Sequence, residues 1–99
     1  MIAGGRLIRH VVVRGRVQGV GFRAWTEGVA LAKGLEGWVR NRRDGAVEAV
    51  FAGPAERVRD MVEACRRGPP GARVENLDVR DAGTELLVNR VGFSVLPTV

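Results

Sequence analysis

The sequence has one cysteine, one histidine, one lysine and no tyrosine among its 99 residues. A single cysteine cannot form an internal disulfide, which excludes a secreted disulfide framework and a cysteine-rich metal site. No spacing of histidine, cysteine or carboxylate residues follows a metal-binding pattern. We therefore expect neither a bound metal nor a cofactor.

The sequence also lacks a long apolar run, an internal repeat and a low-complexity segment. Residues 1–10 include Arg6 and Arg9, and they do not resemble the apolar core of a signal peptide or a membrane span. We expect a cytoplasmic protein that does not associate with a membrane. Apolar residues make up 45% of the chain and charged residues 27%, as in ordinary folded domains. We expect one monomeric domain over residues 1–99, with residues 1–6 as a flexible segment.

Basic residues are abundant by comparison. The 16 basic residues outnumber the 11 acidic ones, which gives a formal net charge of +5. This charge attracts anions such as phosphate, nucleic acid or an acidic membrane surface. Every basic residue except Lys33 is arginine, whose planar guanidinium suits carboxylate and phosphate oxygens.

The spacing of apolar residues predicts a β-strand, helix, strand, strand, helix, strand order with a short last strand. The strands are expected at Leu7–Arg14, Leu35–Arg42, Ala46–Ala52, Arg73–Arg80 and Phe93–Leu96, and the helices at Phe22–Ala32 and between Pro54 and Gly68. This order is that of the α+β, ferredoxin-like βαββαβ sandwich, in which two helices cover one face of an antiparallel sheet. We expect the first strand to be central.

A loop with Gly15, Gly19 and Gly21 connects the first expected strand to the first expected helix. Glycines let the backbone turn so that several N–H groups point inward and bind an anion. The helix adds its unpaired first-turn N–H groups and the positive end of its dipole. Arg23 lies in that turn, where it can donate two parallel hydrogen bonds to phosphate oxygens. The order of elements favours a phosphate site over a plain turn beside a solvated arginine.

Two other phosphate-binding motifs are excluded at this loop. Gly19, Gly21 and Ala24 satisfy the G-x-G-x-x-A pattern, but a dinucleotide site needs parallel strands connected through helices. The pair Asp44-Gly45 instead predicts a tight hairpin between the second and third strands. No Lys-Ser or Lys-Thr pair of a Walker A loop follows either.

Asn41 is the second informative residue. It lies on the second expected strand, on the same face as Val39. Asparagine is depleted in strands, so its presence indicates either a local need for a hydrogen-bonding amide or an ordinary hydrogen-bonded strand end.

Other polar groups are weaker candidates for chemistry. His10 lies in an apolar strand and Cys65 on the apolar face of the second helix, so we expect both to be structural. Asp44 fits the hairpin turn. We expect Glu48 on the solvent side of its strand, and we assign neither carboxylate a catalytic role.

Two segments closely resemble the signatures of the acylphosphatase family. Residues 15–23 match G-x-V-Q-G-V-x-F-R, and residues 37–48 match G-W-V-x-N-x-x-D-G-x-V-E. The resemblance spans about residues 7–96 and is less close over residues 81–91 and 94–99. The two catalytic residues of the family match Arg23 and Asn41. Its phosphate-binding loop falls on the backbone of Arg16, Val17, Gln18, Gly19, Val20, Gly21 and Phe22.

The resemblance implies an enzyme that hydrolyses carboxyl-phosphate anhydrides, with a small acyl phosphate as substrate and no phosphoenzyme. The loop and Arg23 would stabilise the charge on the phosphoryl oxygens, while Asn41 would hold the attacking water in line. Inorganic phosphate or sulfate is expected to bind the same loop.

The alternative is a basic nucleic-acid-binding module, because RNA-recognition domains share the ferredoxin-like fold and the charge is +5. Such a sheet carries aromatic residues in the RNP1 pattern, which this sequence lacks. The rings of Phe22, Trp25 and Trp38 are expected in the core instead. A non-catalytic phosphate-binding or regulatory piece of a larger assembly is a third possibility, and the presence of both Arg23 and Asn41 argues against it.

Overall fold

The structure is a computed structural model, and it describes residues 5–87 and 92–99. The described elements follow the predicted order, with a short 3₁₀ helix, η1, added before the last strand. In chain order they are β1 (Arg6–Arg16), α1 (Phe22–Ala32), β2 (Glu36–Asn41), β3 (Val47–Pro54), α2 (Ala55–Arg67), β4 (Arg73–Asp81), η1 (Thr84–Leu87) and β5 (Phe93–Val95).

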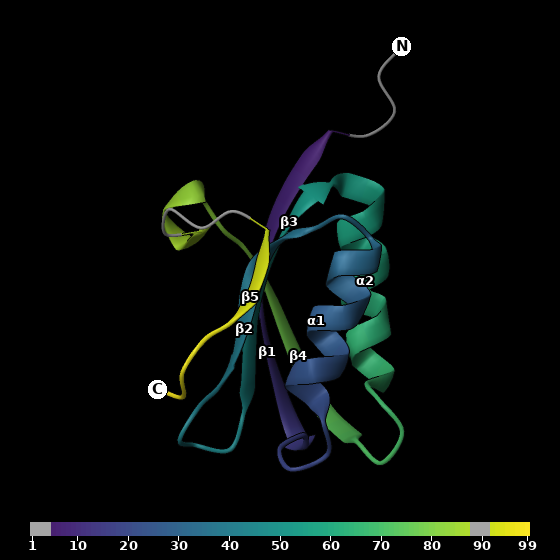
Figure 1. Cartoon of the computed structure of the whole chain (residues 1–99), viewed down its shortest axis with the longest axis vertical. Coiled ribbons are helices and arrows are strands. Elements are labelled where there is room, and N and C mark those ends of the chain that lie inside the picture. The colour runs from purple at the N-terminus through teal and green to yellow at the C-terminus, as the bar shows by residue number, and fades with distance from the viewer. Residues whose placement is uncertain (1–4, 88–91) are drawn as a thin grey trace.

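The strands form one sheet in the order β4-β1-β3-β2-β5, and both helices lie on the same face of it (Figure 1). The ferredoxin-like fold is thus confirmed, and β1 is an interior strand as predicted. The strands β1 to β4 pair antiparallel as predicted, and the short additional strand β5 pairs parallel with β2. The last residues of β4 lie at the same end of the sheet as the first residues of β2. The chain therefore starts β5 from that end, and β5 runs in the same direction as β2.

The core lies between the sheet and the two helices. Val11 and Val13 of β1, Val39 of β2 and Phe51 of β3 are almost fully buried on this face. Four residues of α2 close the core at the predicted i, i+3, i+4 and i+7 spacing, namely Val58, Met61, Val62 and Cys65. Burial raises the pKa of the Cys65 thiol to about 12, so this thiol stays protonated and unreactive.

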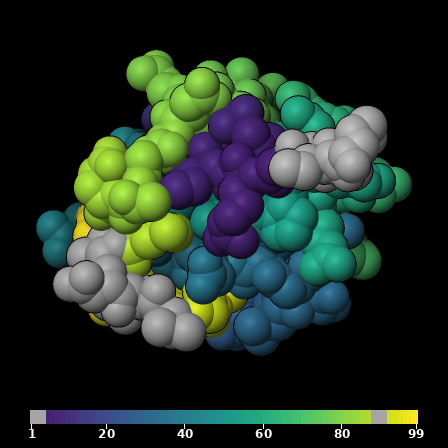
Figure 2. All heavy atoms as spheres, turned by 90° about the horizontal axis from the view of Figure 1, so that it is seen from above, coloured from purple at the N-terminus to yellow at the C-terminus, as the bar shows by residue number. Residues whose placement is uncertain are grey.

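The N-terminal end of β1 is held by its neighbours. Arg6 pairs with Pro54, and the backbone N–H of Ala55 donates to the Gly5 oxygen at 2.7 Å. Figure 2 shows this end from above, with purple N-terminal residues between teal residues of the fifties and yellow-green residues of the eighties. Arg6, the last residue of the segment expected to be flexible, is thus the first residue of β1. Residues 1–4 of that segment lie outside the described residues.

The face of the sheet opposite the helices carries a polar cluster around Glu48. The Glu48 carboxylate accepts hydrogen bonds from His10 Nε2 at 2.6 Å and from Arg40 Nε at 2.8 Å. Glu48 thus lies on the helix-free side of its strand, as predicted, but its side chain is only 12% exposed because His10 and Arg40 cover it. His10 is structural, as expected, and lies on this open face. The Trp38 ring is buried beneath the Arg40 guanidinium, 4.5 Å from the ring centroid.

Glu48→Gln is expected to lower the free energy of unfolding by about 2 kcal/mol at pH 7, because it weakens two charge-assisted hydrogen bonds. Partial burial acts to raise the pKa of Glu48, but the hydrogen bonds and charges of His10 and Arg40 outweigh it and hold the pKa below its ordinary value of 4.5. Because the pKa of Glu48 is lower in the folded protein than in the unfolded protein, its charge stabilises the fold at pH values above the unfolded-state pKa. This stabilisation is lost as the pH falls through the folded-state pKa.

Urea unfolding of Glu48→Gln and of the unsubstituted chain at pH 7 and pH 3 measures this effect. The difference in the free energy of unfolding between the two proteins should be smaller at pH 3 than at pH 7. Glu63→Gln is the matched control, because Glu63 pairs with Arg66 on the exposed surface of α2 and the variant should lose less than 1 kcal/mol. A Glu48→Gln difference that stays constant with pH would contradict the role given to the carboxylate charge.

Candidate active site

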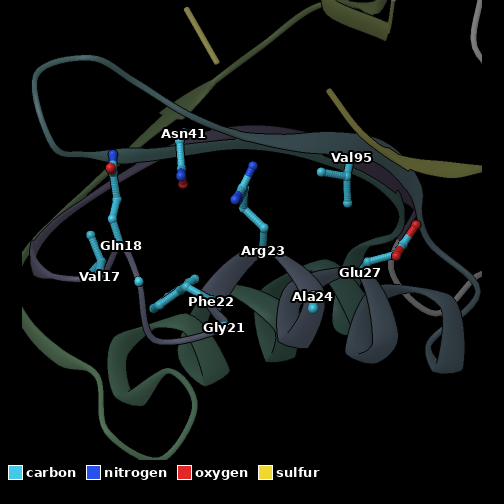
Figure 3. Close-up of a pocket in the computed structure, with 10 residues that line it drawn as sticks. Val17, Gln18, Gly21, Phe22, Arg23, Ala24, Glu27, Asn41 and Val95 are labelled. Atoms are coloured by element: carbon cyan, nitrogen blue, oxygen red, sulfur yellow. The ribbon is translucent and has the colours of Figure 1, made fainter. Parts of the chain in front are cut away.

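A cavity of 360 Å³ lies between the loop after β1, the first turns of α1 and the end of β2 (Figure 3). Arg23 and Asn41, the two residues singled out from the sequence, both line it. Five of the seven predicted loop residues line it too, namely Val17, Gln18, Gly19, Gly21 and Phe22. Arg16 ends β1 in its pairing with Arg73, and Val20 packs against the core, so neither of these lines the cavity.

The loop between β1 and α1 is concave because of two glycines. Gly19 and Gly21 have φ angles of 74° and 78°, a left-handed conformation that costs other residues about 1 kcal/mol or more. No atom lies within 4 Å of where a Cβ would stand at either glycine, so the backbone conformation alone requires them. Buried Val17 and Phe22 anchor the two ends of the loop. A rigid concave backbone of this kind can present several N–H groups to one anion.

Gln18 ties this loop to the turn between β2 and β3. Its side-chain Nε2 donates to the carbonyl oxygens of Arg42 at 2.8 Å and Ala46 at 2.9 Å. Asp44 shapes the same turn, because its Oδ1 accepts from the Ala46 N–H at 3.0 Å and this bond is the main reason that its pKa is lowered. The turn role predicted for Asp44 is therefore confirmed. Because Asn41 immediately precedes the turn, Gln18 fixes the loop relative to Asn41.

Gln18→Ala is expected to lower the free energy of unfolding by about 1–2 kcal/mol, since it removes two hydrogen bonds between segments far apart in the sequence. It should also weaken inorganic phosphate binding, because the loop is no longer held in place. Urea unfolding and a phosphate titration measure the two effects. Gln18→Glu keeps the size of the side chain but removes the N–H donor, so its free energy of unfolding should fall by at least as much. Full stability in both variants would contradict the role of Gln18 in joining the loop to the turn.

Arg23 is the second residue of α1, and its guanidinium projects into the cavity toward β2 (Figure 3). Gly21 caps this helix without a side chain, and the first turn has no acidic residue. The first-turn N–H groups of α1 therefore have no intrahelical partner and no side-chain cap. Six other arginines pair with carboxylates, whereas Arg23 makes no ion pair within the described part of the chain; the six are Arg6, Arg9, Arg14, Arg40, Arg42 and Arg66.

Asn41 is the last residue of β2, opposite Val47 of β3. It lies on the helix-covered face together with Val39, as its spacing predicts, and its carboxamide points into the cavity from the sheet side (Figure 3). Its backbone oxygen accepts from the N–H of Val99, so the position is held from both edges of the strand. A carboxamide donor and acceptor thus face the guanidinium of Arg23 across the same cavity.

The acylphosphatase family model matches residues 9–95. The chain belongs to the acylphosphatase family. An acylphosphatase from Bradyrhizobium diazoefficiens is 61% identical over 97 residues, which cover 95% of this chain and 98% of the relative. The solved acylphosphatase from Coxiella burnetii superposes with a TM-score of 0.84 at 34% identity, covering 92% of this chain and 93% of that one. That from Bacillus subtilis gives 0.83 at 38% identity, covering 91% and 98%. None of these comparisons favours a nucleic-acid-binding module.

The acylphosphatase cavity includes three lining residues that the sequence analysis did not select: Ala24, Glu27 and Val95. Glu27 lies four positions after Arg23 on α1, so helical periodicity alone could have placed it on the same face. Ala24 directly follows Arg23, and helical periodicity does not place it on that face. Val95 could not have been found this way, because its position depends on the pairing of β5 with β2.

Other chemically capable groups of this acylphosphatase lie away from the cavity. Cys65 is buried in the core and His10 is on the opposite face of the sheet. Within residues 5–87 and 92–99, no three side chains of histidine, cysteine, aspartate or glutamate come together where they could hold a metal ion. Of the two helices that the structure describes beside η1, neither is long and apolar enough to cross a membrane.

Proposed function

We propose that this chain hydrolyses small acyl phosphates by direct attack of water on phosphorus, with Arg23 binding the phosphoryl group and Asn41 positioning the water. Membership of the acylphosphatase family supports the reaction. The observation that carries the residue roles is that Arg23, Asn41 and the loop line one cavity of 360 Å³. That volume suits a small ligand.

The phosphoryl group is placed against the concave loop and the start of α1. There it accepts hydrogen bonds from backbone N–H groups of the loop residues that line the cavity, and it meets the positive end of the α1 dipole. Arg23 donates two parallel hydrogen bonds to its oxygens. Inorganic phosphate and sulfate have the same tetrahedral oxygens, so both should bind there in competition with substrate.

In the reaction, the oxygen of water forms a bond to phosphorus while the bond from phosphorus to the acyl oxygen breaks. The electron pair of that bond leaves with the carboxylate, which is a weak base and needs no proton from the enzyme. The enzyme forms no covalent bond to the phosphoryl group, so it accelerates the reaction mainly by positioning the reactants and stabilising charge. Asn41 accepts a hydrogen bond from the water and directs its lone pair at phosphorus. A phosphoryl oxygen accepts the proton that the water loses.

Hydrolysis of an acyl phosphate in ¹⁸O-labelled water, with a chelator present, tests this function. The label is expected in inorganic phosphate and not in the carboxylate, and the chelator should not lower the rate, because no step assigned here uses a metal. Label in the carboxylate would mean that water attacks the carbonyl carbon, and the proposed geometry would then be wrong.

We also propose that the chain is a monomer and is located in the cytoplasm. The cavity is lined by side chains and backbone of one chain, so the site does not need a second copy. The single cysteine has no partner for an internal disulfide, as is common for proteins of a reducing compartment. Light scattering of the purified chain should give the mass of one copy, and a stable dimer would contradict this part of the proposal.

A further inference from the structure

We propose that the end of the cavity formed by Ala24, Glu27 and Val95 receives the acyl group, and that Glu27 disfavours acyl groups that carry a free carboxylate. The preferred substrates would then be acyl phosphates whose acyl group is uncharged and at least partly apolar. This inference rests on the proposed function, because it concerns the leaving-group side of the same reaction.

The direction of attack places the acyl group at this end. When water attacks phosphorus in line, the leaving oxygen lies on the side of phosphorus opposite the water. Figure 3 shows the carboxamide of Asn41 on one side of the Arg23 guanidinium, and Val95 and Glu27 on the other side. With the water held by Asn41 and the phosphoryl group by Arg23, the acyl group extends toward Val95 and Glu27.

Val95 and Ala24 give this end an apolar surface. Val95 belongs to β5 and pairs with Val39 of β2, which puts its side chain on the helix-covered face at the edge of the cavity. Val95 is 40% exposed, so its methyl groups are available for contact with a ligand. The Ala24 methyl group lies on the opposite side, on α1. An aliphatic or aromatic acyl group would bury part of both surfaces.

Glu27 gives the same end a negative charge. It lies four positions after Arg23, about one helical turn along α1. Its carboxylate makes no ion pair with any residue that the structure describes, and seven ion pairs elsewhere in that part of the chain use other groups. The cavity is therefore positive where the phosphoryl group binds and negative beyond it. A second carboxylate on the acyl group would approach a like charge, which disfavours binding.

Benzoyl phosphate and 4-carboxybenzoyl phosphate test this discrimination, because they share a rigid ring and differ in one negative charge. We expect kcat/KM to be about ten-fold higher for benzoyl phosphate, and the preference to weaken as ionic strength rises. Equal kcat/KM values for the two substrates would overturn the inference. Hydrolysis of neither substrate would contradict the proposed function as well, so the two failures are distinguishable.

Glu27→Gln isolates the charge, because it keeps the size and hydrogen-bonding reach of the side chain. The preference for benzoyl phosphate should fall to about two-fold in this variant, since the like-charge repulsion is gone. Glu63→Gln is the matched control, because it removes one negative charge from the exposed face of α2, outside the cavity. If both variants changed the preference equally, net charge and not Glu27 would set it, and the inference would be wrong.

Val95→Thr tests the apolar side of the same end. Threonine is β-branched like valine and equally suited to a strand, so the variant keeps the β5 pairing and replaces one methyl group by a hydroxyl group. We expect the KM for benzoyl phosphate to rise about three-fold and the inhibition constant of inorganic phosphate to stay unchanged. An equal change in both constants would place Val95 at the phosphoryl end and would overturn the assignment.

Discussion

Replacing Arg23 by alanine is expected to lower kcat/KM for benzoyl phosphate by about 10³-fold or more. The guanidinium projects into the cavity and is not engaged by a carboxylate of the described residues, so its hydrogen-bonding capacity is free for the phosphoryl oxygens. Removal of one preorganised donor to a transition-state oxyanion costs about 10²–10³-fold, and Arg23 supplies two together with a positive charge. Steady-state kinetics of Arg23→Ala and of the unsubstituted chain give the ratio of their kcat/KM values. Isothermal titration with inorganic phosphate should show that the variant also loses phosphate binding.

Two further variants separate the causes of the Arg23 effect. Arg23→Lys keeps the charge but not the planar pair of donors, so it should recover only a small part of the activity. Arg59→Ala removes a positive charge from the exposed side of α2, outside the cavity, and should leave kcat/KM within about two-fold of the original value. Activity in Arg23→Ala equal to that of Arg59→Ala would refute the assigned role.

Asn41→Ala is expected to lower kcat by about 10²–10³-fold, which corresponds to about 3–4 kcal/mol, with little change in inorganic phosphate affinity. The carboxamide faces Arg23 across the cavity and holds the water in this proposal, so its loss removes an orienting contact of the transition state. This split between kcat and phosphate binding distinguishes Asn41 from Arg23, whose loss should abolish both.

Asn41→Asp and Asn76→Ala complete the test. Aspartate has the size of asparagine but brings a negative charge toward the phosphoryl group, so it should impair phosphate binding as well as turnover. Asn76 lies exposed on β4 and does not line the cavity, so its alanine variant is the matched control for loss of a strand carboxamide. Unchanged kcat in Asn41→Ala would mean that another group positions the water.

Local sequence signals predicted most of the fold. The valine-rich run of β1, the Asp44-Gly45 hairpin and the apolar face of α2 each specify one element without help from distant residues, and all three agree with the structure. Arg23 and Asn41 could be selected because their motifs combine an anion-binding loop with an unexpected strand amide. That they line one cavity could be seen only in the folded chain, since 18 positions, including the rest of α1, separate them in the sequence.

Long-range pairing determined the features that sequence reasoning missed. Glu48 alternates as a solvent-facing strand residue should, yet His10 of β1 and Arg40 of β2 reach it from both neighbouring strands and shield it. The parallel pairing of β5 follows from where β4 ends, and it alone brings Val95 to the cavity. Neither contact has a local signature, because each joins segments that only the sheet order makes neighbours.

A phosphate titration followed by ¹H–¹⁵N NMR of the whole chain tests most directly whether the loop, Arg23 and Asn41 share one bound anion. The backbone amides of Gly19, Gly21 and Phe22, the Arg23 Nε–H and the Asn41 side-chain amide should shift together and give one dissociation constant. Shifts confined to Arg14 and Arg80, which lie beside His10 on the face of the sheet opposite the helices, would contradict a single shared site. Different dissociation constants for the loop and Asn41 would contradict it too.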